Sequence, residues 1–149
     1  NVYNRVYYND KAFSGFAIYP KDTASFNDGG SNWHLETINM PEAWEYTTGS
    51  NKFLLGVSDA GYDTKHSDLN GRFASILTSR NHNHGMGVVG TMAANTDNGI
   101  GISGINWKTK VVVSDMGDAG VEAVITAQKD GKRVRLINNS WGYHLPTSF

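Results

Sequence analysis

The 149-residue sequence contains no cysteine, which excludes a disulfide-linked scaffold and metal sites built on thiolates. It has only 3 prolines, and no apolar run approaches the ~20 residues that a membrane-spanning helix needs. It also lacks an excess of charge of one sign, because 13 basic residues stand against 14 acidic ones. The near-neutral charge argues against nucleic acid as the main partner, since neutralising phosphates requires a basic excess.

Glycine, by contrast, is abundant, with 17 residues in the chain. Many glycines with few prolines favour tight turns where strands pass into helices. This composition is typical of α/β enzymes. The length fits one domain or part of one, large enough to bury a modest core.

The first 32 residues differ from the rest of the sequence. Residues 1–32 are rich in Tyr, Phe and Asn without a clear period, and residues 27–32 (Asn-Asp-Gly-Gly-Ser-Asn) are typical of a loop. We predict that they form an N-terminal extension or the remnant of a pro-segment. Because the sequence starts at Asn1 with no signal-like segment, we expect a processed or trimmed product. Residues 33–149 are predicted to form the folded unit.

Apolar runs of strand length alternate with helical segments along residues 33–149. The predicted strands are 53–57, 73–77, 111–113 and 134–138, and the predicted helices are 41–46, 84–94 and 119–129. Asp118 is expected to cap the last helix, and Gly131 to follow its end. Strand, helix and strand in this order form βαβ units, which predicts an α/β fold with a parallel sheet flanked by helices.

Two polar segments follow this pattern at positions where α/β folds place their sites, the carboxyl ends of strands. Asp59 follows the apolar run 53–57 after one serine, and Gly61 then turns the chain. His84 stands at the start of a glycine-rich helix. Taken alone, each has a structural interpretation, since an aspartate can cap a turn and a lone histidine is often structural.

Three blocks in the same order resemble the subtilisin-like serine proteases, the subtilases (peptidase S8). The blocks are residues 59–61 (Asp-Ala-Gly), 84–91 (His-Gly-x-x-Val-x-Gly-Thr) and 137–142 (Ile-Asn-Asn-Ser-Trp-Gly). Three flanking segments are also similar to family segments: 33–44, 61–69 and 98–105. The resemblance implies a doubly wound, subtilisin-like α/β fold of which residues 33–149 are the N-terminal half, so that the catalytic domain is incomplete.

The resemblance also implies the catalytic roles of an Asp-His-Ser triad. Asp59 matches the acid that orients the imidazole and stabilises its cation, and His84 matches the general base. Ser140, Trp141 and Gly142 match the strand that binds the substrate backbone by β-augmentation. Trp141 would wall the pocket for the residue before the scissile bond. The expected function is a serine endopeptidase acting on peptides or proteins.

A structural calcium site is a further implication of the resemblance, since many family members hold calcium in a loop after the histidine helix. The matching positions here are Asp68, Asp97, Asn98, Ile100 and Ile102. Side-chain and backbone oxygens from these residues could supply several of the six to eight ligands that Ca²⁺ prefers. The alternative is an ordinary Asn/Asp/Gly turn. No organic cofactor is expected.

The family's nucleophile motif, Gly-Thr-Ser-Met-Ala, does not occur in these 149 residues. Asn138 and Asn139 do not match the family's oxyanion asparagine. Without the nucleophile no acyl-enzyme forms, so we expect the isolated chain to be inactive. We also expect a second chain to supply the C-terminal half, or edge-to-edge self-association of the open strand. Family resemblance further implies a secreted or cell-surface protein.

Three positions depart from the family pattern and support a first alternative. Ala60 replaces the usual Ser or Thr after the acid, and Met86 and Gly87 replace the Thr and second His of His-Gly-Thr-His. These departures leave open a non-catalytic, peptide-binding subtilase-like domain. The presence or absence of a Gly-Thr-Ser motif in the sequence encoded after Phe149 would distinguish the two functions.

The second alternative is a metal-binding module. His82 and His84 are two residues apart, so they would share one face of a strand, and Asp59 or Asp63 could complete the site. However, the neighbouring residues are typical of a loop rather than a strand.

Overall fold

The computed structural model describes residues 33–142 apart from 81, 97 and 99–100, and these residues form a four-stranded parallel sheet. The strands lie in the order β2-β3-β1-β4. They are β1 (Leu54–Ser58), β2 (Phe73–Ile76), β3 (Lys110–Ser114) and β4 (Val134–Asn138). Each begins and ends within one residue of its prediction. The predicted α/β class with a parallel sheet is confirmed.

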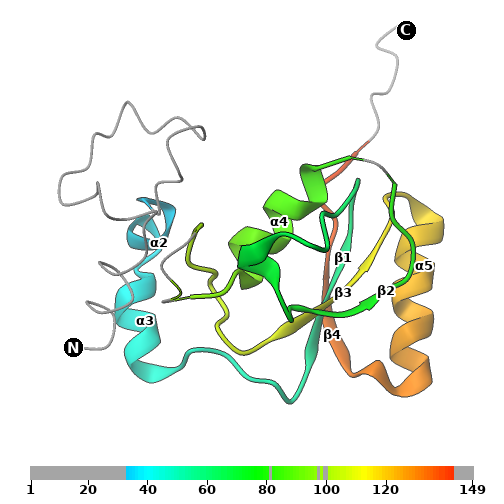
Figure 1. The fold of residues 1–149 in the computed structure, drawn as a ribbon. Coiled ribbons are helices and arrows are strands. Elements are labelled where there is room, and N and C mark those ends of the chain that lie inside the picture. The colour runs from blue at the N-terminus through cyan, green and yellow to red at the C-terminus, as the bar shows by residue number, and fades with distance from the viewer. Residues whose placement is uncertain (1–32, 81, 97, 99–100, 143–149) are drawn as a thin grey trace, which may run out of the picture.

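Helices cover both faces of the sheet, as a doubly wound fold requires. They are α2 (Trp33–Thr37), α3 (Met40–Tyr46), α4 (His84–Ala93), α5 (Asp118–Ala127) and the short η2 (Ser67–Leu69) and η3 (Gln128–Lys132). Helix α4 contacts β1 and β3 on one face, and α5 contacts β1, β3 and β4 on the other (Figure 1). Helices α2 and α3 lie together at the far side of α4.

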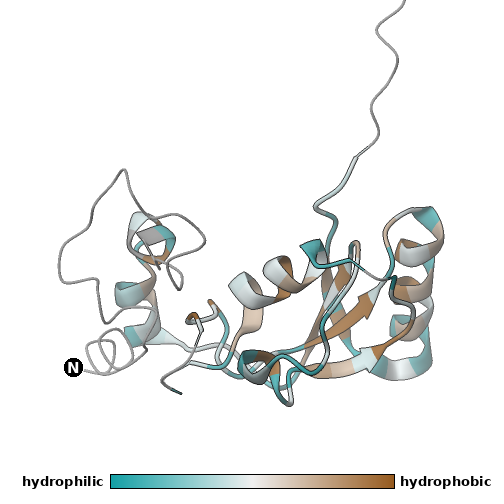
Figure 2. Cartoon of the chain, turned by 45° about the horizontal axis from the view of Figure 1, so that its top comes forward, coloured by the Kyte–Doolittle hydropathy of each residue, from teal (hydrophilic) through white to brown (hydrophobic). Residues whose placement is uncertain are grey.

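The core consists of two apolar clusters, one on each face of the sheet. Leu55, Val57, Val111 and Val113 point toward α4, while Val112 points toward α5. Because neighbouring residues of a strand face opposite sides, the continuous apolar runs of β1 and β3 fill both clusters. Figure 2 shows these strands as the hydrophobic centre of the fold. Burial of each valine contributes about 1.5–3 kcal/mol to stability.

The start of α5 differs from its prediction. Gly117, not Asp118, is the N-cap residue, and Asp118 is the first residue of the helix. Gly117 has φ 101°, a conformation that glycine adopts without a steric penalty. Asp118 still places its negative charge in the first turn, where it interacts favourably with the helix dipole. Gly131, expected after the helix, lies in η3 with φ 87°, where the helical path breaks.

The N-terminal helices are anchored by two tryptophans. Pro41 occupies the first turn of α3, as predicted. The rings of Trp44 and Trp107 lie 5.1 Å apart, and the Trp44 indole donates a hydrogen bond to the Ile105 carbonyl at 3.0 Å. Helix α2 was not expected from the sequence. The extension predicted for residues 1–32 lies outside the described residues.

Strand β4 forms one edge of the described sheet. Its inner side pairs with β1, and its outer side has no neighbouring strand in the described part of the chain. Leu136, in the middle of β4, is 56% exposed. Within residues 33–142, no described helix is long and apolar enough to span a membrane.

Candidate active site

Asp59 lies at the carboxyl end of β1, immediately after the last residue of the strand. Its side chain is 1% exposed, and its backbone N–H donates to the Ser114 carbonyl of β3 at 3.0 Å. One carboxylate oxygen, Oδ1, accepts a hydrogen bond from the Ala60 N–H at 2.6 Å. The other, Oδ2, is buried without a hydrogen-bond partner among the described residues. Asp59 is therefore a fixed, desolvated carboxylate rather than a surface turn residue.

His84 faces this carboxylate from the first turn of α4. Its Nδ1 atom lies 2.6 Å from Asp59 Oδ1, although the two residues are 25 positions apart in the sequence. A carboxylate beside Nδ1 accepts a hydrogen bond from the N–H at that atom, which keeps the proton on Nδ1 and leaves Nε2 as the basic nitrogen. The His84 side chain is 53% exposed, so the ring is open to a reactant. The geometry is that of an oriented general base.

Backbone contacts hold the start of α4 against the loop after β1. The Gly85 N–H donates to the Ala60 carbonyl at 3.0 Å, between the residues that follow His84 and Asp59 in the sequence. Gly61 has φ 75°, and a β-carbon there would lie 1.7 Å from the His82 carbonyl oxygen. Only glycine permits this approach. The glycine of the Asp-Ala-Gly block thus allows Asp59 and His84 to meet.

Tyr62 belongs to the same loop and was not selected from the sequence. Its hydroxyl lies 2.7 Å from the Ser114 carbonyl and 3.1 Å from the Val57 carbonyl, at the carboxyl ends of β3 and β1. Burial, and then the nearby charge of Asp59, raise the pKa of the Tyr62 hydroxyl above its usual range. The side chain therefore remains a protonated hydrogen-bond donor.

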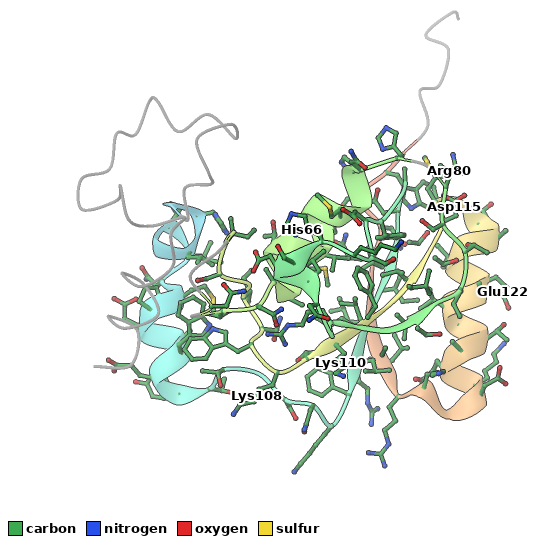
Figure 3. All side chains as sticks on the ribbon, viewed as in Figure 1. His66, Arg80, Lys108, Lys110, Asp115 and Glu122 are labelled. Atoms are coloured by element: carbon green, nitrogen blue, oxygen red, sulfur yellow. The ribbon has the colours of Figure 1, made fainter. Side chains whose placement is uncertain are left out.

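An ion pair at the same edge of the sheet was also absent from the sequence analysis. Arg80 Nε lies 2.6 Å from Asp115 Oδ1, and Figure 3 shows the pair at the end of the molecule opposite Lys108 and Lys110. The Arg80 hydrogen bond lowers the pKa of Asp115, and Asp115 in turn raises the pKa of Arg80. The pair joins the segment leading to His84 to the end of β3.

The predicted substrate-binding residues follow β4 at the same edge. Strand β4 ends at Asn138, whose register partner on β1 is Val57. Ser140 and Gly142 are exposed, and the Asn138 amide donates to the Ser140 hydroxyl at 2.7 Å. Residues 140–142 have no regular secondary structure. Substrate binding by Ser140, Trp141 and Gly142 stays a prediction.

The predicted calcium ligands surround Asp68, as far as they are described. Asp68 is 3% exposed, Oδ1 accepts from the Asn98 amide at 2.8 Å, and Oδ2 accepts from the Ile102 N–H at 2.9 Å. Gly101 fits so closely that a β-carbon there would lie 2.0 Å from Oδ2. Asp97 and Ile100 lie outside the described residues.

Among the described residues of this set, Asp68 supplies the carboxylate, and both of its oxygens accept hydrogen bonds from N–H groups that a bound cation would have to displace. A buried carboxylate enclosed by a loop is a suitable anchor for Ca²⁺. The Asn98 amide faces Asp68 with its nitrogen, so its oxygen would reach a cation there only after the amide group turns by half a revolution. Calcium there would stabilise the loop between α4 and β3 and would take no part in bond cleavage.

The structure does not bring the alternative metal ligands together. His84 directs Nδ1 at Asp59, and His82 Nδ1 accepts a hydrogen bond from the His84 N–H at 3.2 Å. Among the residues described, no group of three or more His, Asp or Glu side chains is arranged to hold a metal ion. Asp63 uses its carboxylate to cap the Lys65 N–H at 3.0 Å.

Comparison with known proteins decides the family. The model of the subtilase family matches residues 50–148, which include Asp59, His84 and the whole sheet. The chain belongs to the subtilase family. Its parallel sheet, with a buried aspartate and a histidine in contact at the carboxyl edge, is part of a subtilisin-like fold. One relative, from Bacillus sp. strain AK1, is a thermophilic serine proteinase that is 32% identical over 116 residues.

Three relatives are much longer than this chain. Halolysin from Haloferax mediterranei is 30% identical over 132 residues, covering 78% of this chain and 25% of halolysin. Fervidolysin from Fervidobacterium pennivorans is 33% identical, covering 74% of this chain and 19% of fervidolysin. The cell wall-associated protease of Bacillus subtilis is 32% identical, covering 62% of this chain and 12% of that protease. The chain thus spans a quarter or less of the length of these relatives.

Proposed function

We propose that this chain supplies the acid and the general base of a subtilisin-like serine endopeptidase. The observation that carries the proposal is the 2.6 Å contact between Asp59 Oδ1 and His84 Nδ1. In this role His84 removes the proton from the attacking serine and then delivers it to the leaving amine. Asp59 holds the imidazole in the tautomer with a basic Nε2 and stabilises its cation during the reaction.

The nucleophile belongs to a segment outside these 149 residues in this proposal. No Gly-Thr-Ser-Met-Ala motif occurs in the sequence, and neither Ser58 nor Ser114 is available, because both are fully buried at strand ends. Residues 33–149 then act as the N-terminal half of the catalytic domain. The exposed outer edge of β4, where Leu136 lies, is the surface on which the segment bearing the serine would add its first strand.

The first test uses the purified 149-residue chain. Alone, it is expected to hydrolyse a fluorogenic peptide no faster than its His84→Ala variant, because no acyl-enzyme can form. Joined to the segment that carries the serine, as one polypeptide or as two, it gains activity that phenylmethanesulfonyl fluoride abolishes. The intact mass of the active material, measured under denaturing conditions, identifies whether one chain or two are present.

The opposite result would remove the proposal. Hydrolysis by the isolated chain that His84→Ala abolishes would require another nucleophile within these residues. An assembled protein that binds peptides but does not cleave them would instead identify the non-catalytic domain suggested by Ala60, Met86 and Gly87.

The substrate is proposed to be a peptide or protein segment that pairs in extended form with residues 140–142. Support comes from the position of these residues after β4, at the edge of the sheet that also carries Asp59. The location is proposed to be outside the cell or at its surface, which is supported by the cell wall-associated protease among the relatives.

Calcium binding at Asp68 is the second testable part of the proposal. Addition of CaCl₂ is expected to raise the melting temperature of the wild-type chain, since a ligand at 100 times its Kd stabilises the folded state by about 2.7 kcal/mol. Asp68→Asn removes one charge from the buried carboxylate and should abolish the shift. Differential scanning calorimetry with CaCl₂ or MgCl₂ measures it.

Asp63→Asn is the matched control, because Asp63 is exposed and lies five residues before Asp68. Its calcium-dependent shift should equal that of the wild type. A wild-type chain whose melting temperature does not respond to calcium, or an equal response in Asp68→Asn, would identify the segment as an ordinary turn.

A further inference from the structure

We propose that Tyr62 is a positioning residue that sets the contact between Asp59 and His84. The proposal rests on the proposed function, because it concerns how the acid and base of that site are held. Tyr62 touches neither the substrate nor the reacting atoms. It acts through its hydroxyl on the strand ends that carry Asp59, and through its ring on the helix that carries His84.

The Tyr62 hydroxyl lies between β1 and β3, at the carboxyl ends of these strands. It is 2.7 Å from the Ser114 carbonyl and 3.1 Å from the Val57 carbonyl. The Ser114 carbonyl also accepts the backbone N–H of Asp59, at 3.0 Å. The Tyr62 hydroxyl and the Asp59 N–H thus share the Ser114 carbonyl as acceptor. The hydroxyl therefore fixes the carbonyl that holds the backbone of Asp59.

The ring lies under the first turn of α4. A β-carbon on Gly85 would come within 2.7 Å of Tyr62 Cε1, so the helix backbone rests directly on the aromatic ring. Gly85 follows His84, and its N–H donates to the Ala60 carbonyl. The ring therefore sets the distance between the start of α4 and the loop that carries Asp59.

The two halves of the side chain act on different partners, and they can be separated by substitution. Tyr62→Phe keeps the ring under Gly85 and removes the donor to Ser114 and Val57. Tyr62→Leu removes both the donor and the aromatic surface. Because burial keeps the hydroxyl protonated at neutral pH, the loss of the donor is not masked by ionisation.

The experiment measures the ¹⁵N chemical shifts of the His84 ring by two-bond ¹H–¹⁵N correlation in the 149-residue chain. These shifts report the tautomer and the hydrogen bond to Asp59 and do not require slow proton exchange. Tyr62→Phe is expected to move both ring nitrogens from their wild-type values, and Tyr62→Leu to move them further. Tyr46→Phe is the matched control, because Tyr46 is 90% exposed, and it should leave the shifts unchanged.

In the assembled enzyme, Tyr62→Phe is expected to lower kcat about tenfold with little change in KM, since small displacements of a catalytic group reduce the rate strongly. Wild-type ¹⁵N shifts for His84 in a folded Tyr62→Phe chain would overturn the proposal and leave Tyr62 as a packing residue. A lower melting temperature of Tyr62→Phe together with unchanged His84 ¹⁵N shifts would likewise identify Tyr62 as a packing residue. The shifts are independent of hydrolysis, so an inactive assembly would count against the proposed function and not against this inference.

Discussion

Replacement of His84 by alanine is expected to lower kcat/KM of the assembled enzyme by about 10⁴-fold or more, because the serine then has no base to remove its proton. The fold should tolerate the change. The side chain is half exposed, and it makes a hydrogen bond to Asp59 Oδ1. Steady-state hydrolysis of a peptide substrate measures the loss, and circular dichroism shows that the variant is folded.

His66→Ala serves as the control for this substitution. His66 caps the short helix η2 and accepts the Asp68 N–H at 3.3 Å, away from the Asp59–His84 contact. We expect its kcat/KM to stay within a few-fold of the wild type. Equal losses in the two variants would mean that any histidine on this surface affects the protein similarly, and the assignment of His84 as the base would be wrong.

Gly61→Ala is expected to destabilise the chain by about 3 kcal/mol or more, the range of severe steric and backbone substitutions. A β-carbon at Gly61 would lie 1.7 Å from the His82 carbonyl oxygen and 2.5 Å from its α-carbon. Because this partner is backbone, the segment from His82 to His84 must move away from Asp59. Urea denaturation measures the change in the free energy of unfolding.

Gly71→Ala separates the steric effect from the backbone conformation. Gly71 has φ 74°, almost the same as the φ 75° of Gly61, yet a β-carbon there would meet no described atom within 4 Å. Its loss should be limited to the cost of a left-handed alanine, roughly 1–2 kcal/mol. If the two substitutions destabilise the chain equally, the close contact between Gly61 and His82 does not contribute to the loss of stability in Gly61→Ala.

The fold could be predicted from the sequence where burial dictates the residue pattern. The central residues of β1 and β3 are apolar because both faces of these strands are buried, and such runs have few other interpretations. The predicted N-cap of α5 was wrong by one residue. Asp118 and Gly117 both favour a helix start, and only the backbone conformation of Gly117 identifies it as the N-cap. Helix α2, five residues long, has too few turns for a periodic pattern to be recognised.

The candidate site was only partly accessible to the same reasoning. Asp59 and His84 were paired through the order of three motifs, since nothing in their separation of 25 residues places them together. Tyr62 and the pair of Arg80 with Asp115 were missed. The Tyr62 hydroxyl bonds to the Ser114 carbonyl 52 residues away, and Arg80 pairs with Asp115 35 residues away. These groups become neighbours only after the strands have assembled. The signal in the sequence was a tyrosine directly after the Asp-Ala-Gly block.

The most direct test of the central claim is a double-mutant cycle on Asp59 and His84 in the assembled enzyme. If the two side chains act as one catalytic unit, Asp59→Asn alone lowers kcat/KM by about 10⁴-fold. The double variant should then be no slower than His84→Ala alone, because the aspartate works only through the imidazole. Independent losses that multiply in the double variant would contradict the account, since they would show that Asp59 acts without His84.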